Sequence, residues 1–378
     1  MSFVLTSGGT AGHINPTLAV AAELTNRGKR VIFAGSIGGM EERLVHAAGL
    51  EYQAFAAKGF NRQNPFTLLS SSFILSRSTG KACSWLKAVE AEVVGAFGGY
   101  VSVPVGRAAA REHIPLLIHE QNSHMGWSNK YLSKHADRIA LTYEAAGENL
   151  GADALTRSTL TGNPVRPEFD ALRKPQHAAD LRAEFRNNLG LAGDDLVLLV
   201  FGGSQGARHI NQAIVGLAPV LMRRSHFAVV HLTGRKEFED VQAALSNELN
   251  ESELSRWKLI DYCDRMPSAF AAADIVLSRA GASSLAELAV AAKPTVLVPF
   301  PYATADHQRK NAESLVRAGA AEMVLDSELD TPRFLDVLLS LIDGKEKRSA
   351  LLSASQDLQS TNAAAEVAEL LIDLAQKR

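Results

Sequence analysis

Two glycine-rich turns of the same build are the residues of this chain best suited to chemistry. They are Ser7-Gly8-Gly9-Thr10-Ala11-Gly12-His13 and Gly202-Gly203-Ser204-Gln205-Gly206-Ala207, and each links a short apolar run to a helical pattern. Glycine lets the backbone turn tightly and approach a ligand. The helix N-terminus that follows offers unpaired N–H groups and a positive dipole end, which bind phosphate. Two such turns predict two nucleotide-binding-type domains.

A further group of small and polar residues could extend the second of these sites. Arg279-Ala280-Gly281 follows the apolar run Ile275–Ser278, and the small residues after it open another helix. Glu287 falls about one turn into that helix, where it could accept hydrogen bonds from ribose hydroxyls or merely compensate the helix dipole. Gln308, in a polar loop after another apolar run, could bond sugar hydroxyls, or its loop could simply be solvated.

His13 is the candidate general base because it directly follows the first glycine turn. The positive end of a helix dipole disfavours an imidazolium, so we expect a neutral ring that can accept a proton. The alternative is a histidine that only packs against the turn.

A block of four polar residues, His119-Glu120-Gln121-Asn122, ends the apolar run Leu116–His119. Polar groups at such a position are costly to bury unpaired, so they must bind a ligand or one another. Gly98-Gly99-Tyr100 ends another apolar run in the same half of the chain.

Short apolar runs alternate with helical stretches, which predicts an α/β fold with parallel sheets covered on both faces. The predicted strands of the first half are Phe3–Thr6, Val31–Ala34, Val93–Phe97, Leu116–His119 and Ile139–Thr142. Those of the second half are Leu196–Phe201, Phe227–Thr233, Leu259–Tyr262, Ile275–Ser278 and Thr295–Val298. Doubly wound sheets bind ligands beyond the carboxyl ends of their strands. Two such Rossmann-like domains facing a cleft form the GT-B architecture of nucleotide-sugar glycosyltransferases.

The predicted domain boundary is the proline-rich connector Gly162-Asn163-Pro164-Val165-Arg166-Pro167. Each proline keeps the preceding residue out of a helix, so this segment should be extended and stiff. We therefore expect domains at 1–162 and 163–360. A final helix over about 361–378, capped by Thr361 or Asn362, could pack back on the first domain.

Composition indicates an ordinary globular enzyme. The chain has 378 residues, of which 46% are hydrophobic and 21% charged, and its only cysteines are Cys83 and Cys263. Two cysteines provide no disulfide framework, which fits a reducing cytoplasm. No apolar run approaches the roughly 20 residues that span a bilayer, and Met1-Ser2-Phe3-Val4 lacks a basic leader region. The basic residues are too sparse for a nucleic-acid partner.

Taken in order, these motifs resemble the MurG-type transferase family of peptidoglycan synthesis over essentially the whole chain. The resemblance rests on Gly8–His13 with Pro16, Gly98–Ser102, His119–Asn122, Gly162–Arg166, Gly202–Ala207 and Arg279–Gly281. That family moves N-acetylglucosamine from UDP-N-acetylglucosamine to undecaprenyl-diphosphate-linked N-acetylmuramyl-pentapeptide, which converts lipid I to lipid II. The resemblance implies that the first domain takes the acceptor and the second binds the UDP-sugar.

The resemblance also implies roles for individual residues. The donor diphosphate would lie near Ser204, Gln205 and Arg166, its uracil near Cys263, and its ribose at Glu287. The sugar hydroxyls would lie near Asn122 and Gln308, helped by the backbone of Ala282, Ser283, Ser284 and Leu285. His13 would be the base, supported by Glu120, with Thr10, Ala11 and Gly12 lining the acceptor side. Ala11 replaces a glycine common in the family, and Cys263 replaces a larger apolar residue.

The expected reaction is one inverting displacement, in which an acceptor hydroxyl attacks the anomeric carbon while UDP leaves. Arg166 and the helix N-termini would stabilise the diphosphate charge. No Asp-x-Asp pair is present, so neither a cofactor nor a tightly bound metal is expected. The alternatives are a related transferase with another lipid acceptor, a UDP-sugar 2-epimerase, and a nucleotide sensor without catalysis.

A basic stretch also predicts peripheral binding to the cytoplasmic face of the cell membrane. No acid lies between Glu51 and Glu90, but five basic residues do: Lys58, Arg62, Arg77, Lys81 and Lys87. Four apolar residues there are spaced for one helix face: Phe66, Leu69, Phe73 and Ile74. Such a patch suits an anionic lipid surface. The alternative is a helix that faces the core and has a solvated basic flank.

Overall fold

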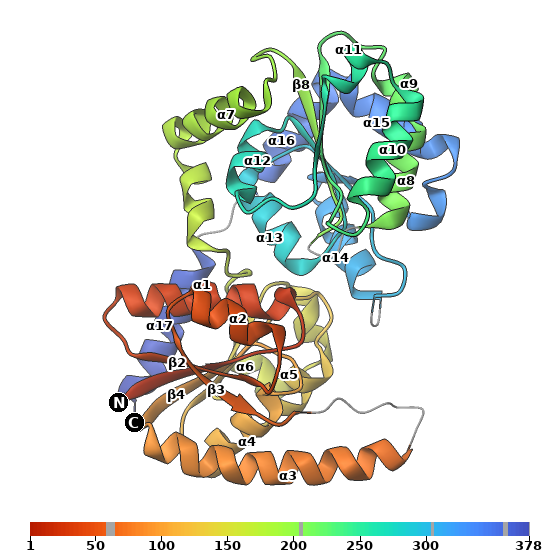
Figure 1. Cartoon of the computed structure of the whole chain (residues 1–378). Coiled ribbons are helices and arrows are strands. Elements are labelled where there is room, and N and C mark those ends of the chain that lie inside the picture. The colour runs from red at the N-terminus through yellow and green to blue at the C-terminus, as the bar shows by residue number, and fades with distance from the viewer. Residues whose placement is uncertain (58–64, 204–206, 304–305, 358–361, 378) are drawn as a thin grey trace. The chain divides into compact units, whose positions relative to one another are not determined.

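The computed structural model describes residues 1–57, 65–203, 207–303, 306–357 and 362–377, with the side chains of 65–73 and 149 outside the description. The chain divides into two compact units, each an α/β unit built on its own sheet (Figure 1). The first unit is Met1–Pro167 with Thr361–Arg378, and the second unit is Glu168–Ser360. The boundary between the units thus falls after Pro167, at the end of the proline-rich connector. The boundary predicted from the sequence lies five residues earlier, after Gly162.

The sheet of the first unit has the order β3-β2-β1-β4-β5-β6-β7, and every neighbouring pair is parallel. Its strands are β1 (Ser2–Thr6), β2 (Val31–Ser36), β3 (Glu51–Phe55), β4 (Ala91–Ala96), β5 (Leu116–Glu120), β6 (Arg138–Leu141) and β7 (Ser158–Leu160). The helices are α1 (Ala11–Asn26), α2 (Met40–Ala47), α3 (Pro65–Ala88), α4 (Ser102–Arg111), α5 (Trp127–Leu132), α6 (Ala152–Thr156) and α17 (Ala363–Gln376). A 3₁₀ turn, η1, spans Glu144–Asn149.

The sheet of the second unit has the order β10-β9-β8-β11-β12-β13 and is also parallel throughout. Its strands are β8 (Leu196–Phe201), β9 (Phe227–Leu232), β10 (Trp257–Ile260), β11 (Ile275–Ser278), β12 (Thr295–Leu297) and β13 (Ala321–Met323). The helices are α7 (Pro175–Leu189), α8 (Arg208–Gly216), α9 (Ala218–Leu221), α10 (Phe238–Glu248), α11 (Glu251–Leu254), α12 (Met266–Ala272), α13 (Ala282–Ala291), α14 (His307–Arg317), α15 (Pro332–Ile342) and α16 (Lys345–Asp357). The 3₁₀ turns are η2 (Pro167–Arg173) and η4 (Asp326–Glu328).

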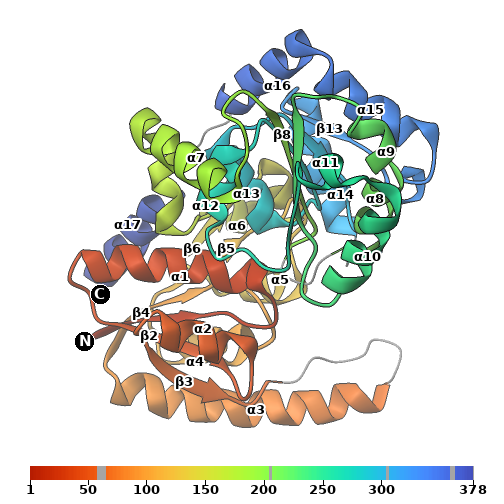
Figure 2. The ribbon, with the colours of Figure 1, turned by 45° about the horizontal axis from the view of Figure 1, so that its top comes forward.

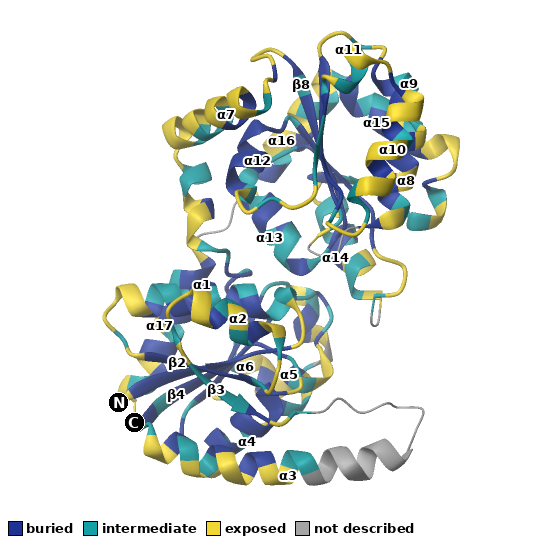
Figure 3. Ribbon diagram, viewed as in Figure 1, coloured by how far each residue is buried: buried dark blue, intermediate teal, exposed yellow. Residues whose placement is uncertain are grey.

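All ten predicted strands are present, with ends that differ by a few residues. The central strands carry buried side chains on both faces, which explains why they appear in the sequence as continuous apolar runs (Figure 3). The strands that the sequence did not predict are β3, β7 and β13, and all three lie at the edges of sheets. An edge strand such as β3 is only partly buried, so its sequence Glu-Tyr-Gln-Ala-Phe has no continuous apolar run.

The C-terminal helix α17 packs on the first unit, beside α1 in both views (Figures 1 and 2). Val367, Ala368 and Leu371 share one buried apolar cluster with residues of α1 and β1. Asn362, one of the two predicted caps, accepts a hydrogen bond from the Ala365 N–H at 3.3 Å. Within the described ranges, no helix has both the length and the apolar character needed to cross a membrane.

Candidate functional site

Three neighbouring strands of the first unit end in the motifs that the sequence singles out. The glycine turn at Gly8 follows β1, Gly98-Gly99 follows β4, and the polar block begins in β5. Because β1, β4 and β5 are adjacent and parallel, their carboxyl ends lie at one edge of the sheet. This is the edge where doubly wound sheets bind ligands.

Glycine is required at two positions of this edge by close packing. A Cβ on Gly99 would lie 2.3 Å from the carbonyl oxygen of Gly8, and Gly99 has a φ of +84°. A Cβ on Gly98, with a φ of +97°, would lie 3.0 Å from Cε1 and Nδ1 of His13. The backbone after β4 therefore supports both the first glycine turn and the imidazole ring of His13.

The start of α1 presents the residues expected on the acceptor side. Thr10 is the N-cap, and its side chain makes no capping hydrogen bond. The N–H groups of Ala11 and Gly12 belong to the first turn of the helix, so they have no intrahelical partner. His13 is the third residue of the helix and is half-buried. The arrangement suits an anionic group at the helix N-terminus beside an imidazole.

Gln121, rather than Glu120, contacts His13. The Nδ1 atom of His13 lies 2.9 Å from Oε1 of Gln121. The sequence pointed to Glu120 as the support for His13, but side chains alternate across a strand, and the carboxylate of Glu120 binds a different set of groups.

Glu120 organises the loop that follows β5. Its buried carboxylate accepts hydrogen bonds from four N–H groups, at 2.9–3.2 Å: the backbone and side-chain amides of Asn122, the backbone of Gly126 and the side chain of Asn129. These four hydrogen bonds fix the loop that carries Asn122. We interpret Glu120 as a structural support for this loop.

In the second unit the donor motifs meet at the point where the strand order reverses. The turn at Gly202 follows β8, Gly281 follows β11, and these two strands are hydrogen-bonded neighbours. Such a switch point is the usual ligand site of an open α/β sheet. Gly203 has a φ of +89°, whereas Ser204 and Gln205 lie outside the described residues.

The N-terminus of α13 carries the segment expected to contact the donor. The helix begins at Ala282, and its N-cap residue is Gly281, so no side chain at the N-cap position binds the N–H groups of the first turn. The hydroxyl of Ser283 is buried and has no hydrogen-bond partner within the described part of the chain. Ser284 is half-buried and Leu285 is buried in the same turn, while Glu287 is buried as the sixth residue of the helix.

The remaining predicted residues lie on separate segments. Gln308 is at the start of α14, and its amide oxygen accepts a hydrogen bond from the Phe300 N–H at 3.0 Å. That bond leaves the amide NH₂ group to donate. Cys263 is half-buried after β10. Arg166 is half-buried in the connector and belongs to the first unit.

A charged network that the sequence did not reveal supports the start of α8, next to the second glycine turn. His209 lies between Asp326, with Nδ1 to Oδ2 at 2.7 Å, and Asp330, with Nε2 to Oδ2 at 3.0 Å. Arg279 pairs with the other oxygen of Asp326 and with the carbonyl groups that follow β12. Arg279 directly follows β11, Asp326 begins η4 and His209 lies in α8, so the partners are far apart in the sequence and no local pattern marks them.

The hydrogen bond to Asp326 raises the pKa of His209 above its usual 6.5, although partial burial opposes the change. Burial alone would raise the pKa of Asp326, but the hydrogen bonds from His209 and Arg279 outweigh it and lower that pKa. Protonated His209 therefore stabilises the folded second unit.

We expect the His209→Ala variant to unfold about 2–4 °C below the parent at pH 6, the change that roughly 1 kcal/mol produces in a unit of this size. The stabilisation is complete below the unfolded pKa of 6.5 and is lost as pH rises through the raised folded pKa, so the difference should shrink at pH 9. Thermal unfolding of both proteins at the two pH values tests this. His226→Ala is the matched control, because His226 is exposed and 3.5 Å from the exposed Asp194. An equal difference at both pH values would contradict the assignment.

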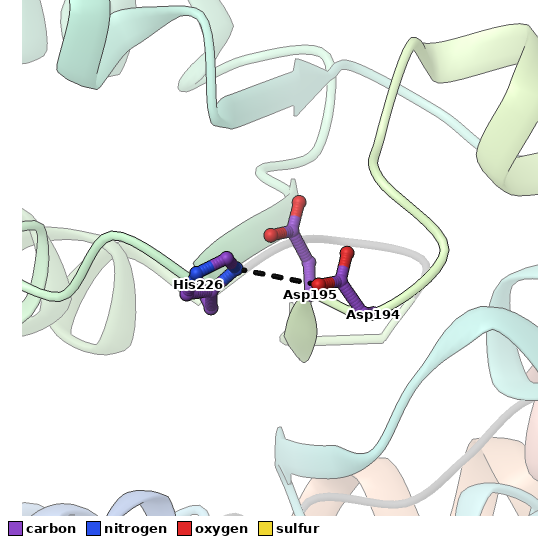
Figure 4. Close-up of side chains that lie close together, drawn as sticks. All are labelled: Asp194, Asp195 and His226. Atoms are coloured by element: carbon purple, nitrogen blue, oxygen red, sulfur yellow. Dashed lines mark ion pairs between the residues drawn. The ribbon is translucent and has the colours of Figure 1, made fainter.

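One group among the described residues has the spacing of a metal site, namely Asp194, Asp195 and His226 (Figure 4). Asp194 and His226 are largely exposed. The group lies at the amino ends of β8 and β9, opposite the edge that carries the donor motifs. We therefore assign it no part in the site.

Comparison with known proteins covers nearly the whole chain. Residues 3–141 match the Glycosyltransferase family 28 N-terminal domain, and residues 197–371 match the Glycosyltransferase family 28 C-terminal domain. The UDP-N-acetylglucosamine–N-acetylmuramyl-(pentapeptide) pyrophosphoryl-undecaprenol N-acetylglucosamine transferase of Halothermothrix orenii is 37% identical, over 94% of each chain. The protein of that name from Desulfitobacterium hafniense is 34% identical over 100% of both chains.

Solved structures agree in fold. The chain is similar to Acinetobacter baumannii MurG, with a TM-score of 0.76 and 26% identity over 98% of this chain and 99% of that one. It is also similar to the UDP-GlcNAc 2-epimerase from Neisseria meningitidis, with a TM-score of 0.64 over both full chains. The identity to the epimerase is 14%, so that likeness concerns the fold alone.

Proposed function

This chain belongs to glycosyltransferase family 28, and from that premise we infer that it transfers N-acetylglucosamine from UDP-N-acetylglucosamine to undecaprenyl-diphosphate-linked N-acetylmuramyl-pentapeptide. It is a UDP-N-acetylglucosamine-dependent hexosyltransferase of peptidoglycan synthesis with a GT-B fold. The observation that carries this inference is the 37% identity to a transferase of that specificity over 94% of both chains. Transfer of labelled sugar to a lipid-linked muramyl acceptor tests it.

We propose that His13 removes the proton from the attacking hydroxyl of the acceptor. His13 lies at the carboxyl edge of the first sheet and next to the N-terminus of α1, where an anionic acceptor group can be held. Attack on the anomeric carbon breaks its bond to the diphosphate oxygen, and the electron pair leaves with UDP. The N-terminus of α13 and Arg166 would stabilise the charge that develops on UDP.

The donor residues that we propose are on the second unit apart from Asn122 and Arg166. Glu287 would bind the ribose, Gln308 the sugar hydroxyls, and the segment around Cys263 the uracil. The support is the position of α13 at the strand-order reversal and the donor capacity that Gln308 retains. Ser204 and Gln205 lie outside the described residues, so their proposed contact with the diphosphate is based on the family resemblance.

A UDP-sugar 2-epimerase is the competing enzyme with this fold. The structural likeness to one such enzyme is not accompanied by sequence similarity above 14%, whereas the transferases match at 34–37%. The transferase function is therefore favoured.

We also propose that the first unit binds reversibly to anionic lipid on the cytoplasmic face of the membrane through α3. Arg77 and Lys81 are exposed, while Ala82 and Leu86 on the same helix are buried. Lys87 is already paired with Glu112, at 2.6 Å, so it adds little to the basic surface. Phe66, Leu69 and Phe73, which the sequence assigns to the apolar face, have side chains outside the described residues. Ile74 is half-buried.

Reversing two charges on α3 tests this binding. The Arg77→Glu, Lys81→Glu variant should bind anionic vesicles at least about 30-fold more weakly at low salt, because it loses two basic residues that each contribute about 1 kcal/mol near such a surface and gains two repelled charges. Co-sedimentation with phosphatidylglycerol vesicles measures the change. Lys236→Glu, Lys345→Glu is the control, since both lysines are exposed on the second unit. Equal binding by parent and α3 variant would show that α3 is not the docking surface.

A further inference from the structure

A buried chain of hydrogen bonds runs behind His13 and connects it to the connector between the units. Nε2 of His119 lies 3.0 Å from the carbonyl oxygen of Gly162, and Nδ1 of His119 lies 3.0 Å from Nε2 of Gln121. Oε1 of Gln121 lies 2.9 Å from Nδ1 of His13. The side chains of His119 and Gln121 are fully buried.

The orientation of the Gln121 amide is fixed by its surroundings. Its nitrogen lies 3.0 Å from the carbonyl oxygen of Phe97 and 3.1 Å from that of His119. Carbonyl oxygens only accept hydrogen bonds, so the NH₂ group must face them. The opposite orientation would bring Oε1 against two carbonyl oxygens in a buried site. Oε1 therefore faces His13.

The tautomer of His119 agrees with this orientation. Its Nε2 must carry the hydrogen that is donated to the Gly162 carbonyl, which leaves the Nδ1 lone pair to accept an N–H from Gln121. Burial lowers the pKa of His119 to about 4, so the ring is neutral near pH 7. The contact with His119 thus assigns the same end of the Gln121 amide as nitrogen as the two carbonyl contacts do.

We propose that Gln121 is a positioning residue that holds His13 as the Nδ1–H tautomer and so directs its Nε2 lone pair to the reaction. An amide oxygen can only accept, so the nitrogen that faces it at 2.9 Å must carry a hydrogen. A neutral imidazole has one N–H, and Nε2 is then the basic atom. Nε2 takes the proton of the acceptor hydroxyl, and the Nδ1–H bond to Gln121 persists in the imidazolium.

Gly98 adds a steric constraint to this electronic one. The ring of His13 packs against the backbone of Gly98, where a Cβ would approach Cε1 and Nδ1 to 3.0 Å. Gly98 limits where the ring can lie, and Gln121 determines which nitrogen is protonated. The choice of tautomer is independent of the substrate, whereas the role of Nε2 in the reaction rests on the proposed function.

The tautomer can be measured directly on the full-length protein labelled with ¹⁵N-histidine. The His13 signals are those that disappear in the His13→Ala spectrum. At pH 8, where neutral imidazoles prevail, we expect Nδ1 of His13 to show the shift of a protonated nitrogen and Nε2 that of an unprotonated one. The reverse pattern, or shifts averaged between tautomers, would overturn the proposal.

Two variants test the contribution of Gln121. Gln121→Met removes the acceptor at similar length, so it should give averaged His13 shifts and a kcat roughly 10-fold lower, because a hydrogen bond to a charged ring is lost. Asn129→Leu is the control, since Asn129 is also a buried amide next to His119 but binds its carbonyl oxygen and Glu120. It should retain the parent shifts of His13.

A Gln121→Met protein that keeps the Nδ1–H tautomer and the parent kcat would overturn the proposal. If Gln121→Met does not fold, the tautomer of His13 measured in the parent protein is by itself the test of the proposal. A parent with the expected tautomer but no transfer activity would contradict the proposed function and leave the tautomer assignment intact.

Discussion

The His13→Ala variant is expected to lose roughly 10²–10⁴-fold in kcat, the usual contribution of a positioned general base. Its affinity for UDP should not change, because the proposed UDP contacts lie mainly on the second unit whereas His13 lies on the first. Turnover measured with saturating acceptor and UDP binding measured by calorimetry separate the two effects.

His135→Ala is a matched control, since His135 is an exposed histidine of the same unit that contacts Tyr131. It should retain parent turnover. If His13→Ala turned over within a few-fold of the parent, another group or solvent would have to take the proton. Glu120 is a poor substitute, because its four hydrogen-bond donors already occupy the carboxylate.

The Glu287→Ala variant is expected to bind UDP more weakly by roughly 1–3 kcal/mol, or about 5- to 150-fold, because hydrogen bonds from ribose hydroxyls to a charged carboxylate would be lost. We expect this contact because Glu287 lies on α13, the helix that follows β11. Strand β11 is the neighbour of β8, which leads into the second glycine turn. Calorimetric titration with UDP gives the affinity directly.

Glu313→Ala provides the comparison for this loss. Glu313 is also a helical glutamate of the second unit, but it pairs with Arg309 at 3.0 Å on the surface. It should bind UDP like the parent. Unchanged UDP affinity in a folded Glu287→Ala protein would remove the ribose assignment, and the thermal midpoints of both variants show whether they are folded.

The sequence predicted the sheets where burial is strongest. Strand β8 is apolar along its whole length, and β1 is apolar in its three central residues, because both faces of these strands are covered. The edge strand β7 has only three residues and is largely exposed, so it leaves no such pattern. The sequence also identified the turns at Gly8 and Gly202, since glycine is needed there for backbone geometry.

The contacts within the sites could not be predicted in the same way. The sequence brings His13 and the polar block to one edge, but it does not say which side chain of the block faces His13. That depends on side-chain direction at the end of β5, and it selects Gln121 instead of Glu120. The network of His209, Asp326 and Arg279 joins residues more than 40 positions apart, so only the folded chain reveals it.

Every proposed catalytic and substrate-binding role depends on the transfer of N-acetylglucosamine by this chain to a lipid-linked muramyl acceptor. The most direct measurement is to incubate the protein with radiolabelled UDP-N-acetylglucosamine and a soluble lipid-linked N-acetylmuramyl-pentapeptide, and to separate the products. We expect label to appear in a lipid-linked disaccharide together with equimolar UDP, and only when the acceptor is present. Conversion of the UDP-sugar to its 2-epimer without acceptor, or UDP binding with no labelled lipid, would show that the chain is not this transferase.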